Sequence, residues 1–170
     1  KNTIDGSPGG SARSVSVGDI DGDGDLDISL TTYSSSNFYW YENNGSQSFT
    51  RRTISTVNVL FPILIDLDED GDFDFVSHIN DGSNKIAWYE NDGSENFTQN
   101  IIANDYGAQI AVADLDEDGD YDVIGADYTN GHINWYENNG SESFTKNTID
   151  NSDMTNAWDV KVGDVDGDGD

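Results

Sequence analysis

Four aspartate-rich clusters recur along the chain at nearly constant spacing. The first three read Asp-x-Asp-x-Asp-Gly-Asp-x-Asp, and the fourth stops at the seventh place of this pattern. They begin at Asp19, Asp66, Asp114 and Asp164. A second motif, Trp-Tyr-Glu-Asn, keeps the same interval and begins at Trp40, Trp88 and Trp135. A period of about 20–50 residues is typical of solenoids, propellers and arrays. The predicted organisation is one repeat array over residues 1–170, divided into 1–50, 51–98, 99–145 and a shortened 146–170.

The pattern within each repeat indicates β-strands. Apolar residues stand two and four places before each cluster, which predicts a first strand with one buried face. These residues are Val17 and Val15, Leu64 and Pro62, Val112 and Ile110, and Val162 and Val160. A second alternating run follows the cluster, the Trp-Tyr motif supplies a third strand, and a fourth begins nine residues after the Trp. Asn-Asn-Gly-Ser or Asn-Asp-Gly-Ser between the last two suits a tight hairpin with positive φ. The expected fold is all-β, with β-propeller-type blades of four antiparallel strands and about three and a half repeats.

The aspartate pattern itself predicts a metal site. Five carboxylates in nine residues repel one another unless a cation lies among them. Side chains at positions one, three and five can converge when the loop curls, and glycine at position six permits a sharp turn. An EF-hand would need a glutamate at position twelve, where this chain has Leu30, Ser77 or Gly125. The aspartate at position nine can close the shell instead. Six to eight hard oxygen ligands in a flexible loop favour Ca²⁺ over Mg²⁺.

The repeated motifs resemble a known family. Clusters such as Gly18-Asp-Ile-Asp-Gly-Asp-Gly-Asp-Leu-Asp27, combined with Trp-Tyr-Glu-Asn-Asn-Gly, are similar to FG-GAP/VCBS repeats. Those repeats form the calcium-binding blades of integrin-α-type propellers and occur in many large secreted or surface proteins. The Phe-Gly…Gly-Ala-Pro signature of FG-GAP repeats is absent, so the VCBS variant is the closer likeness.

This resemblance implies three complete calcium sites and a partial fourth, with a backbone carbonyl at position seven. The implied ligands are Asp19, Asp21, Asp23, Asp27 and the carbonyl of Asp25; Asp66, Asp68, Asp70, Asp74 and the carbonyl of Asp72; Asp114, Asp116, Asp118, Asp122 and the carbonyl of Asp120; and, in the partial site, Asp164, Asp166, Asp168 and Asp170.

Composition narrows the classes of partner. The formal charge of −27, from 34 acidic and 7 basic residues, opposes binding to nucleic acid. No apolar run approaches the about 20 residues that a membrane span needs. The chain has no cysteine, which excludes disulfides and thiolate metal sites.

Other residues have ordinary explanations. The Trp-Tyr pairs are expected to pack in the core rather than to stack on sugars, and Trp158 is expected to pack as well. His78 and His132 are expected to be surface or strand histidines rather than catalytic ones. Asn44, Asn96 and Asn139 begin glycosylation sequons.

Three functional classes follow from these patterns. The favoured one is a non-enzymatic, calcium-stabilised structural or adhesive module, secreted to the extracellular space or cell surface. The alternative is a carbohydrate-binding module or an accessory propeller of a secreted polysaccharide-active enzyme. Catalysis by this chain is not expected, because near-identical repeats lack the asymmetry of a catalytic site. The expected partners are further repeats of a longer polypeptide or other copies of the chain, which could build a closed propeller or a filament, and glycans or surface proteins.

Overall fold

The computed structural model describes residues 3–33, 35–105, 107–151 and 156–167. Within these ranges the chain forms twelve β-strands and no helix. The strands are β1 (Ala12–Gly18), β2 (Asp27–Thr32), β3 (Phe38–Asn43), β4 (Phe49–Ser55), β5 (Val59–Ile65), β6 (Asp74–Ile79), β7 (Lys85–Asn91), β8 (Phe97–Ala103), β9 (Gly107–Ala113), β10 (Asp122–Asp127), β11 (Ile133–Asn138) and β12 (Phe144–Asp150). The described part of the chain therefore offers no long apolar helix of the kind that crosses a membrane.

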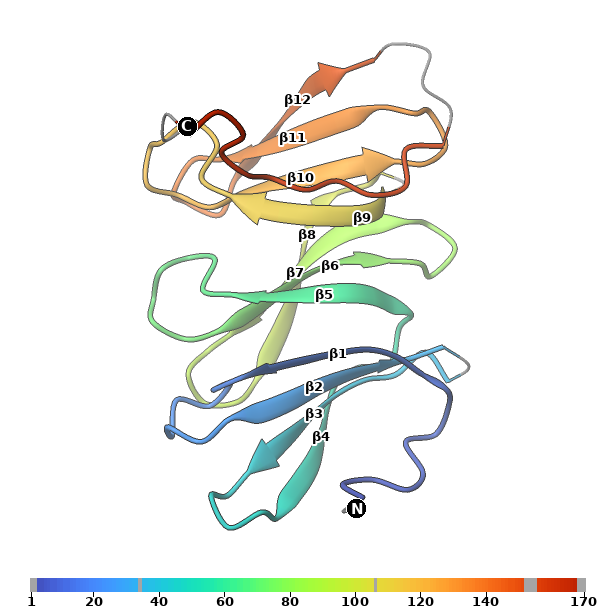
Figure 1. The fold of residues 1–170 in the computed structure, drawn as a ribbon, viewed down its shortest axis with the longest axis vertical. Coiled ribbons are helices and arrows are strands. Elements are labelled where there is room, and N and C mark those ends of the chain that lie inside the picture. Colours follow the sequence, from blue (N-terminus) through green and yellow to red (C-terminus); the bar gives the residue numbers. More distant parts are fainter. Residues whose placement is uncertain (1–2, 34, 106, 152–155, 168–170) are drawn as a thin grey trace.

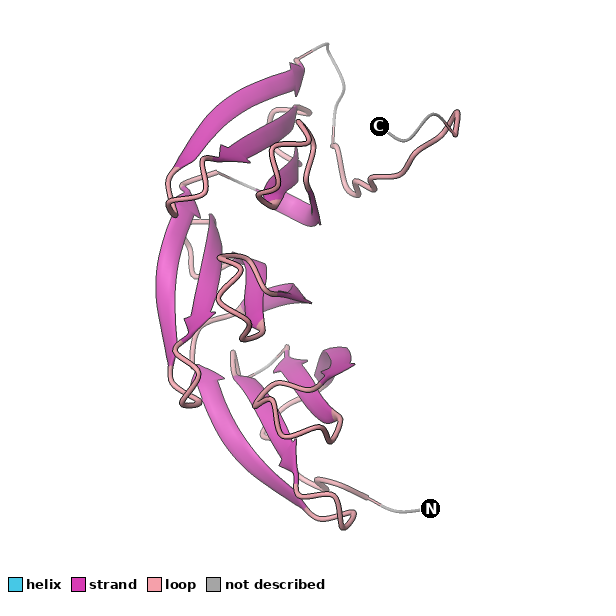
Figure 2. Ribbon diagram, turned by 90° about the vertical axis from the view of Figure 1, so that its left-hand side faces the viewer, coloured by secondary structure: helices cyan, strands magenta, loops and turns pink. Residues whose placement is uncertain are grey.

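The strands form three separate four-stranded sheets, each antiparallel and in simple chain order. The sheets are β1-β2-β3-β4, β5-β6-β7-β8 and β9-β10-β11-β12, which we call blades 1, 2 and 3. They stack along the long axis of the molecule (Figure 1). In the side view the fourth strands follow the convex side of an arc and the first strands follow the concave side (Figure 2). The prediction of propeller-type blades is confirmed, and the three blades do not close into a ring.

The hairpin between the third and fourth strands has the backbone that its sequence predicts. In blade 1 the Asn44 N–H donates to the Ser48 carbonyl oxygen at 3.2 Å. Gly45 inside this loop has a φ of +72°, a conformation that favours glycine. The same closing hydrogen bond recurs in the other two blades, from Asp92 to Asn96 and from Asn139 to Ser143.

The hydrophobic core lies between blades rather than inside any one of them. Trp40 and Trp88 of the Trp-Tyr motif face the following blade, and Tyr89 and Tyr136 face the preceding one. Trp40 of blade 1 thus shares a buried cluster with Phe75 and Tyr89 of blade 2. Trp88 of blade 2 shares the next cluster with Tyr136 of blade 3. The expected core role is confirmed for these residues, whereas Trp135 of blade 3 is only half-buried and belongs to neither cluster.

The tyrosine hydroxyls connect neighbouring blades. Tyr89 of blade 2 donates to Ser55 Oγ at the end of β4, at 3.5 Å. Tyr136 of blade 3 donates at 2.7 Å to Asp105 Oδ2, two residues beyond the end of β8. In blade 1, Tyr41 donates at 3.0 Å to Asp5 Oδ2 in the N-terminal segment. Each hydroxyl therefore finds the acceptor that a buried tyrosine needs.

The prediction that the first strand of every repeat buries one apolar face is wrong for blade 1 and for the fourth repeat. In the fourth repeat residues 156–167 form no strand, and Val162 is exposed. Val15 and Val17 are 64% and 58% exposed. The corresponding Leu64 packs against the core cluster between blades 1 and 2, and Val112 packs against the next cluster. Burial of this face thus requires a preceding blade, and within the described residues no blade lies beside blade 1 on that side.

Candidate metal centres

The three complete aspartate clusters form the loops between the first and second strands of each blade. These loops span residues 19–26, 66–73 and 114–121. The first strands run in the same direction in all three blades, so the loops emerge on one side of the molecule (Figure 1). The repeated sequence therefore places three equivalent candidate metal sites along one side of the molecule.

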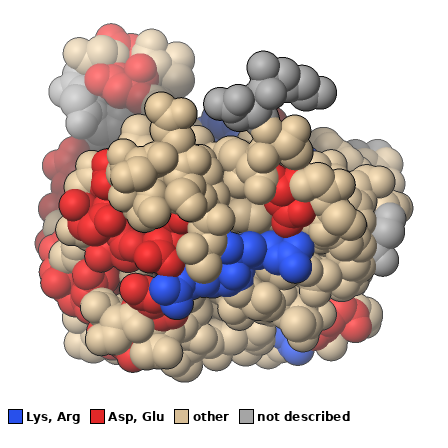
Figure 3. Space-filling view, turned by 90° about the horizontal axis from the view of Figure 1, so that it is seen from below, with Lys and Arg blue, Asp and Glu red and all other residues tan. Residues whose placement is uncertain are grey.

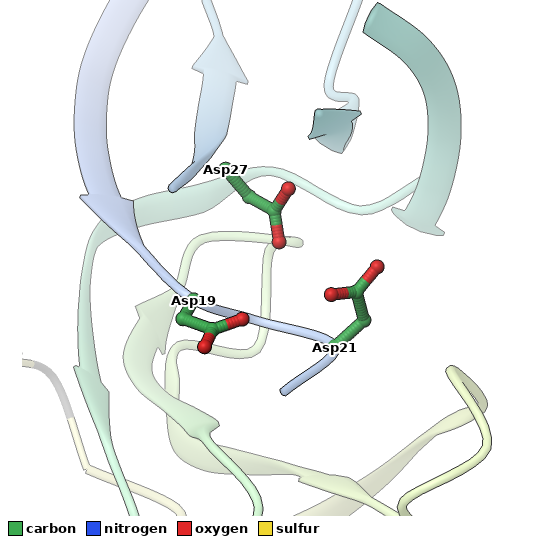
Figure 4. A group of neighbouring side chains, drawn as sticks. All are labelled: Asp19, Asp21 and Asp27. Atoms are coloured by element: carbon green, nitrogen blue, oxygen red, sulfur yellow. The ribbon is translucent and has the colours of Figure 1, made fainter. Parts of the chain in front are cut away.

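The carboxylates at positions one and three converge in every loop. One oxygen from each member of a three-residue group lies within 4.8 Å of the others. The groups are Asp19, Asp21 and Asp27; Asp66, Asp68 and Asp70; and Asp114, Asp116 and Asp122. Figure 4 shows the first group, whose carboxylates point toward a common space. In blades 1 and 3 the third carboxylate of the group comes from position nine, whereas in blade 2 it comes from position five. Asp23, Asp118 and Asp74 lie outside these groups.

Hydrogen bonds within the loop hold its curled shape. In blade 1 the Gly24 N–H donates to Asp19 Oδ2 at 3.0 Å, so position six folds back onto position one. Gly24 has a φ of +94°, which side-chain-bearing residues rarely adopt. The same bond joins Gly71 to Asp66 and Gly119 to Asp114, at 3.1 Å each. The predicted glycine turn is therefore present in all three loops.

The aspartate at position nine is fully buried and ties the loop to the rest of the blade. Asp74 Oδ2 accepts the Leu67 N–H at 3.1 Å, and its Oδ1 accepts the Asn91 N–H at 2.8 Å. Asp27 and Asp122 accept the equivalent pairs. Burial raises the pKa of Asp74 to about 7. A buried carboxylate without a counter-ion is costly to ionise, so a cation beside the loop would favour its charged form.

These loops place the chain in a known family. The model of the FG-GAP-like repeat matches residues 19–77, 66–125 and 114–170, each match running from one aspartate cluster to the next. The chain belongs to the FG-GAP-like repeat family. No curated protein shows a significant match to it.

The fold of these FG-GAP-like repeats also occurs among solved structures. One of them is that of an Agrocybe aegerita lectin, described as specifically recognising non-reducing terminal N-acetylglucosamine. The TM-score is 0.61 at 18% sequence identity, over 86% of this chain and 41% of the lectin chain. The likeness concerns the arrangement of strands, and this chain corresponds to less than half of the lectin's length.

The Asn of the Trp-Tyr-Glu-Asn motif belongs to the same loop system, a role that sequence reasoning missed. Its backbone N–H binds the buried aspartate, and its side-chain Nδ2 donates to the carbonyl of position eight. Asn43, Asn91 and Asn138 make this second bond to Leu26, Phe73 and Tyr121. Asn91 Nδ2 also donates to the Ile20 carbonyl at 3.1 Å, which joins blade 2 to the loop of blade 1. The constant interval between the aspartate cluster and the Trp-Tyr-Glu-Asn motif is the sequence feature that could have indicated this role.

The side chains at position seven face the neighbouring hairpin. A Cβ atom at the hairpin glycine would collide with this carboxylate in every blade. The pairs are Asp25 with Gly45, Asp72 with Gly93, and Asp120 with Gly140. The expected calcium ligand at position seven is the backbone carbonyl oxygen rather than the side chain. The contact of the side chain with the hairpin does not bear on that assignment, which stays a prediction.

The donor set fits a calcium ion. Asp19 Oδ1 and Asp66 Oδ1 are buried and accept no hydrogen bond from the described residues. Burial is the main cause that raises the pKa of Asp21, Asp68 and Asp116, and neighbouring carboxylates raise it further. Buried acceptors without donors are rare in folded proteins and ask for an explanation such as an ion. Clustered carboxylate oxygens are the ligands that Ca²⁺ prefers.

The remaining predicted sites are the partial fourth aspartate cluster and the three glycosylation sequons. In the fourth cluster Asp164 Oδ1 accepts the Gly167 N–H at 2.5 Å, and Asp166 is exposed. Asp168 and Asp170 lie outside the described residues. The sequon residues Asn44, Asn96 and Asn139 are exposed in the hairpins between third and fourth strands.

Acidic surface accompanies the loops. Seen from below, acidic side chains crowd the side that carries the aspartate loops in Figure 1, and Lys and Arg form a band across the adjoining face (Figure 3). Arg52 on β4 pairs with Glu42 of its own blade and with Glu95 of blade 2. The local negative potential of the loops would concentrate cations near them.

Proposed function

We propose that this chain is a non-enzymatic repeat module that Ca²⁺ stabilises for a structural or adhesive role outside the cell. The observation that carries the proposal is the convergence of carboxylates in three equivalent loops, two of which contain a buried aspartate oxygen without a hydrogen-bond donor. Family membership and the lectin-like fold suggest a non-catalytic module.

Calcium would act by joining parts of the blade that are distant in sequence. Within blade 2, Asp66 and Asp68 belong to the loop after β5, and the buried Asp74 opens β6 and accepts from Asn91 on β7. An ion among the loop carboxylates would neutralise their mutual repulsion and hold the first three strands of the blade at one end. Binding that requires the folded loop adds to folding stability.

An extracellular location fits the expected affinity and the surface. Calcium sites of extracellular modules have dissociation constants of about 10⁻⁴–10⁻³ M. The three exposed sequons would be accessible to glycosylation on a secretory route. The exposed face of Val15 and Val17 corresponds to the face through which blade 2 packs on blade 1, and we expect a further repeat as its partner.

The test is a pair of thermal melts, one in EDTA and one in 10 mM CaCl₂. With the affinities above, each site would add about 1.4–2.7 kcal/mol at this concentration. Three sites would add about 4–8 kcal/mol, which raises Tm by about 10–30 °C in a chain of this size. A melt with 10 mM MgCl₂ controls for general screening of charge and is expected to stay close to the EDTA melt. Coincident melts in EDTA and calcium would refute the proposal.

The second candidate function is glycan binding. The fold likeness to a lectin favours it, as do the exposed aromatic residues Tyr33 and Trp158, which are 68% and 63% exposed. These residues do not belong to the repeated Trp-Tyr pairs of the core. Binding to a panel of immobilised glycans, with and without calcium, tests this candidate separately from the melts, and no retention of any glycan would exclude it.

A further inference from the structure

Arg13 differs from the other cationic side chains that the structure describes. Each of the others lies within 3.2 Å of a carboxylate oxygen: Arg51 with Asp5, Arg52 with Glu42, Lys85 with Asp81, Lys146 with Asp105, and Lys161 with Asp159. Arg13 makes no ion pair with any described residue, although the chain has 34 acidic residues against 7 basic ones. A guanidinium left without a carboxylate in so acidic a protein is available for a carboxylate from outside.

Two aromatic rings hold this guanidinium in place. Arg13 Cζ lies 5.3 Å from the centroid of the Tyr33 ring and 5.2 Å from that of the Phe61 ring. Both distances are within the range of cation–π attraction. Tyr33 is 68% exposed and Phe61 37% exposed, so the rings also present apolar surface to solvent. The cluster is therefore a guanidinium flanked by two partly accessible rings.

Backbone irregularities on two adjacent strands create the cluster. The pairing of β1 with β2 shifts between Ala12 and Ser14, which places Arg13 in a β-bulge. The pairing of β5 with β6 shifts between Leu60 and Ile63, and Phe61 within that shift has a φ of +49°. A bulky residue in this left-handed region is strained, and bulges redirect side chains near functional sites.

The cluster breaks the symmetry of the repeats. Six residues before the other aspartate clusters, the residue equivalent to Arg13 is Leu60, Ala108 or Trp158. Arg13 lies near the start of β1, whereas the calcium loop follows the end of that strand. Six residues of extended strand separate the two by roughly 20 Å. A ligand at Arg13 would therefore bind away from the metal loops, at the opposite ends of the first strands (Figure 1).

We propose that Arg13, Tyr33 and Phe61 bind a saccharide that carries a single carboxylate, such as a terminal uronic acid. The planar guanidinium forms two parallel hydrogen bonds with a carboxylate. The exposed ring surface would pack against the apolar face of the pyranose. The net charge of −27 repels polyanions such as acidic peptides, whereas a ligand with a single carboxylate is repelled much less. The proposal deepens the glycan-binding candidate and does not depend on calcium stabilisation.

The experiment compares methyl β-glucuronide with methyl β-glucoside by calorimetric titration in constant calcium. These probes differ only in the carboxylate, so the glucuronide is expected to bind at least 10-fold more tightly. Arg13→Gln is expected to weaken glucuronide binding at least 10-fold, and Arg13→Lys several-fold because lysine cannot form the paired hydrogen bonds. Arg51→Gln is the matched control, since Arg51 also lies over a ring, that of Tyr39, but is already paired with Asp5. It is expected to leave binding unchanged.

Circular dichroism and a Tm equal to that of the wild-type chain in the same buffer establish that each variant folds. Equal binding of the two glycosides, glucuronide binding that survives Arg13→Gln, or an absence of glucuronide binding would overturn the inference. A tetra-aspartate peptide that bound through Arg13 when the glucuronide did not would also overturn it. A neutral glycan that bound independently of Arg13 would leave the broader glycan-binding candidate in place.

Discussion

The two ends of the first strands follow different rules. At the end that carries the aspartate loops, the three blades repeat the converging carboxylates of positions one and three, the glycine turn and the buried aspartate of position nine. At the opposite end the equivalent residues diverge, and Arg13 and Phe61 occupy bulges that place them together. Residues that recur in every blade are expected to serve a role common to all blades, such as stability. Residues that differ between blades are expected to serve a role needed at one place, such as recognition of a ligand.

The largest effect is expected at the repeated end, from Asp74→Ala. The substitution leaves the Leu67 and Asn91 N–H groups in a buried place without acceptors and removes the carboxylate beside the loop. We expect a loss of about 3–5 kcal/mol in the free energy of unfolding, measured by urea denaturation in calcium. Asp72→Ala is the control, because alanine retains the position-seven carbonyl, and its cost is expected to stay below about 1 kcal/mol. Equal costs for the two variants would contradict the distinct roles of these positions.

An intermediate effect is expected at the divergent end, where His78 is buried on β6. Burial, together with the charge of Arg13, lowers the pKa of His78 to about 4. The unfolded chain, with a pKa of about 6.5, then binds more protons than the folded chain below that pH. The contribution of neutral His78 is therefore complete above pH 6.5 and is lost as the pH falls toward 4.

His78→Gln removes this titration. Between pH 6.5 and pH 5 the wild-type chain should lose about 2 kcal/mol more than the variant, at about 1.4 kcal/mol per pH unit. Urea denaturation of both proteins across this range, in saturating calcium, measures the difference. Parallel pH profiles would show that His78 becomes protonated in the folded chain as easily as in the unfolded one.

The smallest effect on stability is expected from Phe61→Gly. Glycine relieves a positive φ that costs of order 1 kcal/mol but also removes the ring from a partly exposed place. The net change in the free energy of unfolding should stay within about 1 kcal/mol, with the calcium-dependent rise in Tm preserved. A large loss of stability would show that the bulge of β5 serves the fold, which would blur the difference between the two ends.

Sequence reasoning succeeded where the local pattern determines the structure. The turns at Gly24, Gly71 and Gly119, the four strands per blade and the core position of Trp88 follow from motifs within one repeat. Sequence reasoning failed where burial depends on a neighbouring blade or strand. Val17 and Leu64 occupy equivalent places in the same pattern, yet only Leu64 has a preceding blade against which it can pack. The bulge at Arg13 likewise depends on pairing between strands, which no local pattern shows.

Calcium titration by calorimetry of the full chain and three single variants tests the central claim most directly. Asp21→Asn, Asp68→Asn and Asp116→Asn each remove the position-three carboxylate, which belongs to the converging group in every blade. We expect the wild-type chain to bind three calcium ions in these loops, with any ion at the partial fourth cluster bound more weakly, and each variant to lose one of the three. Wild-type protein that binds no calcium, or variants that retain its full stoichiometry, would contradict the account.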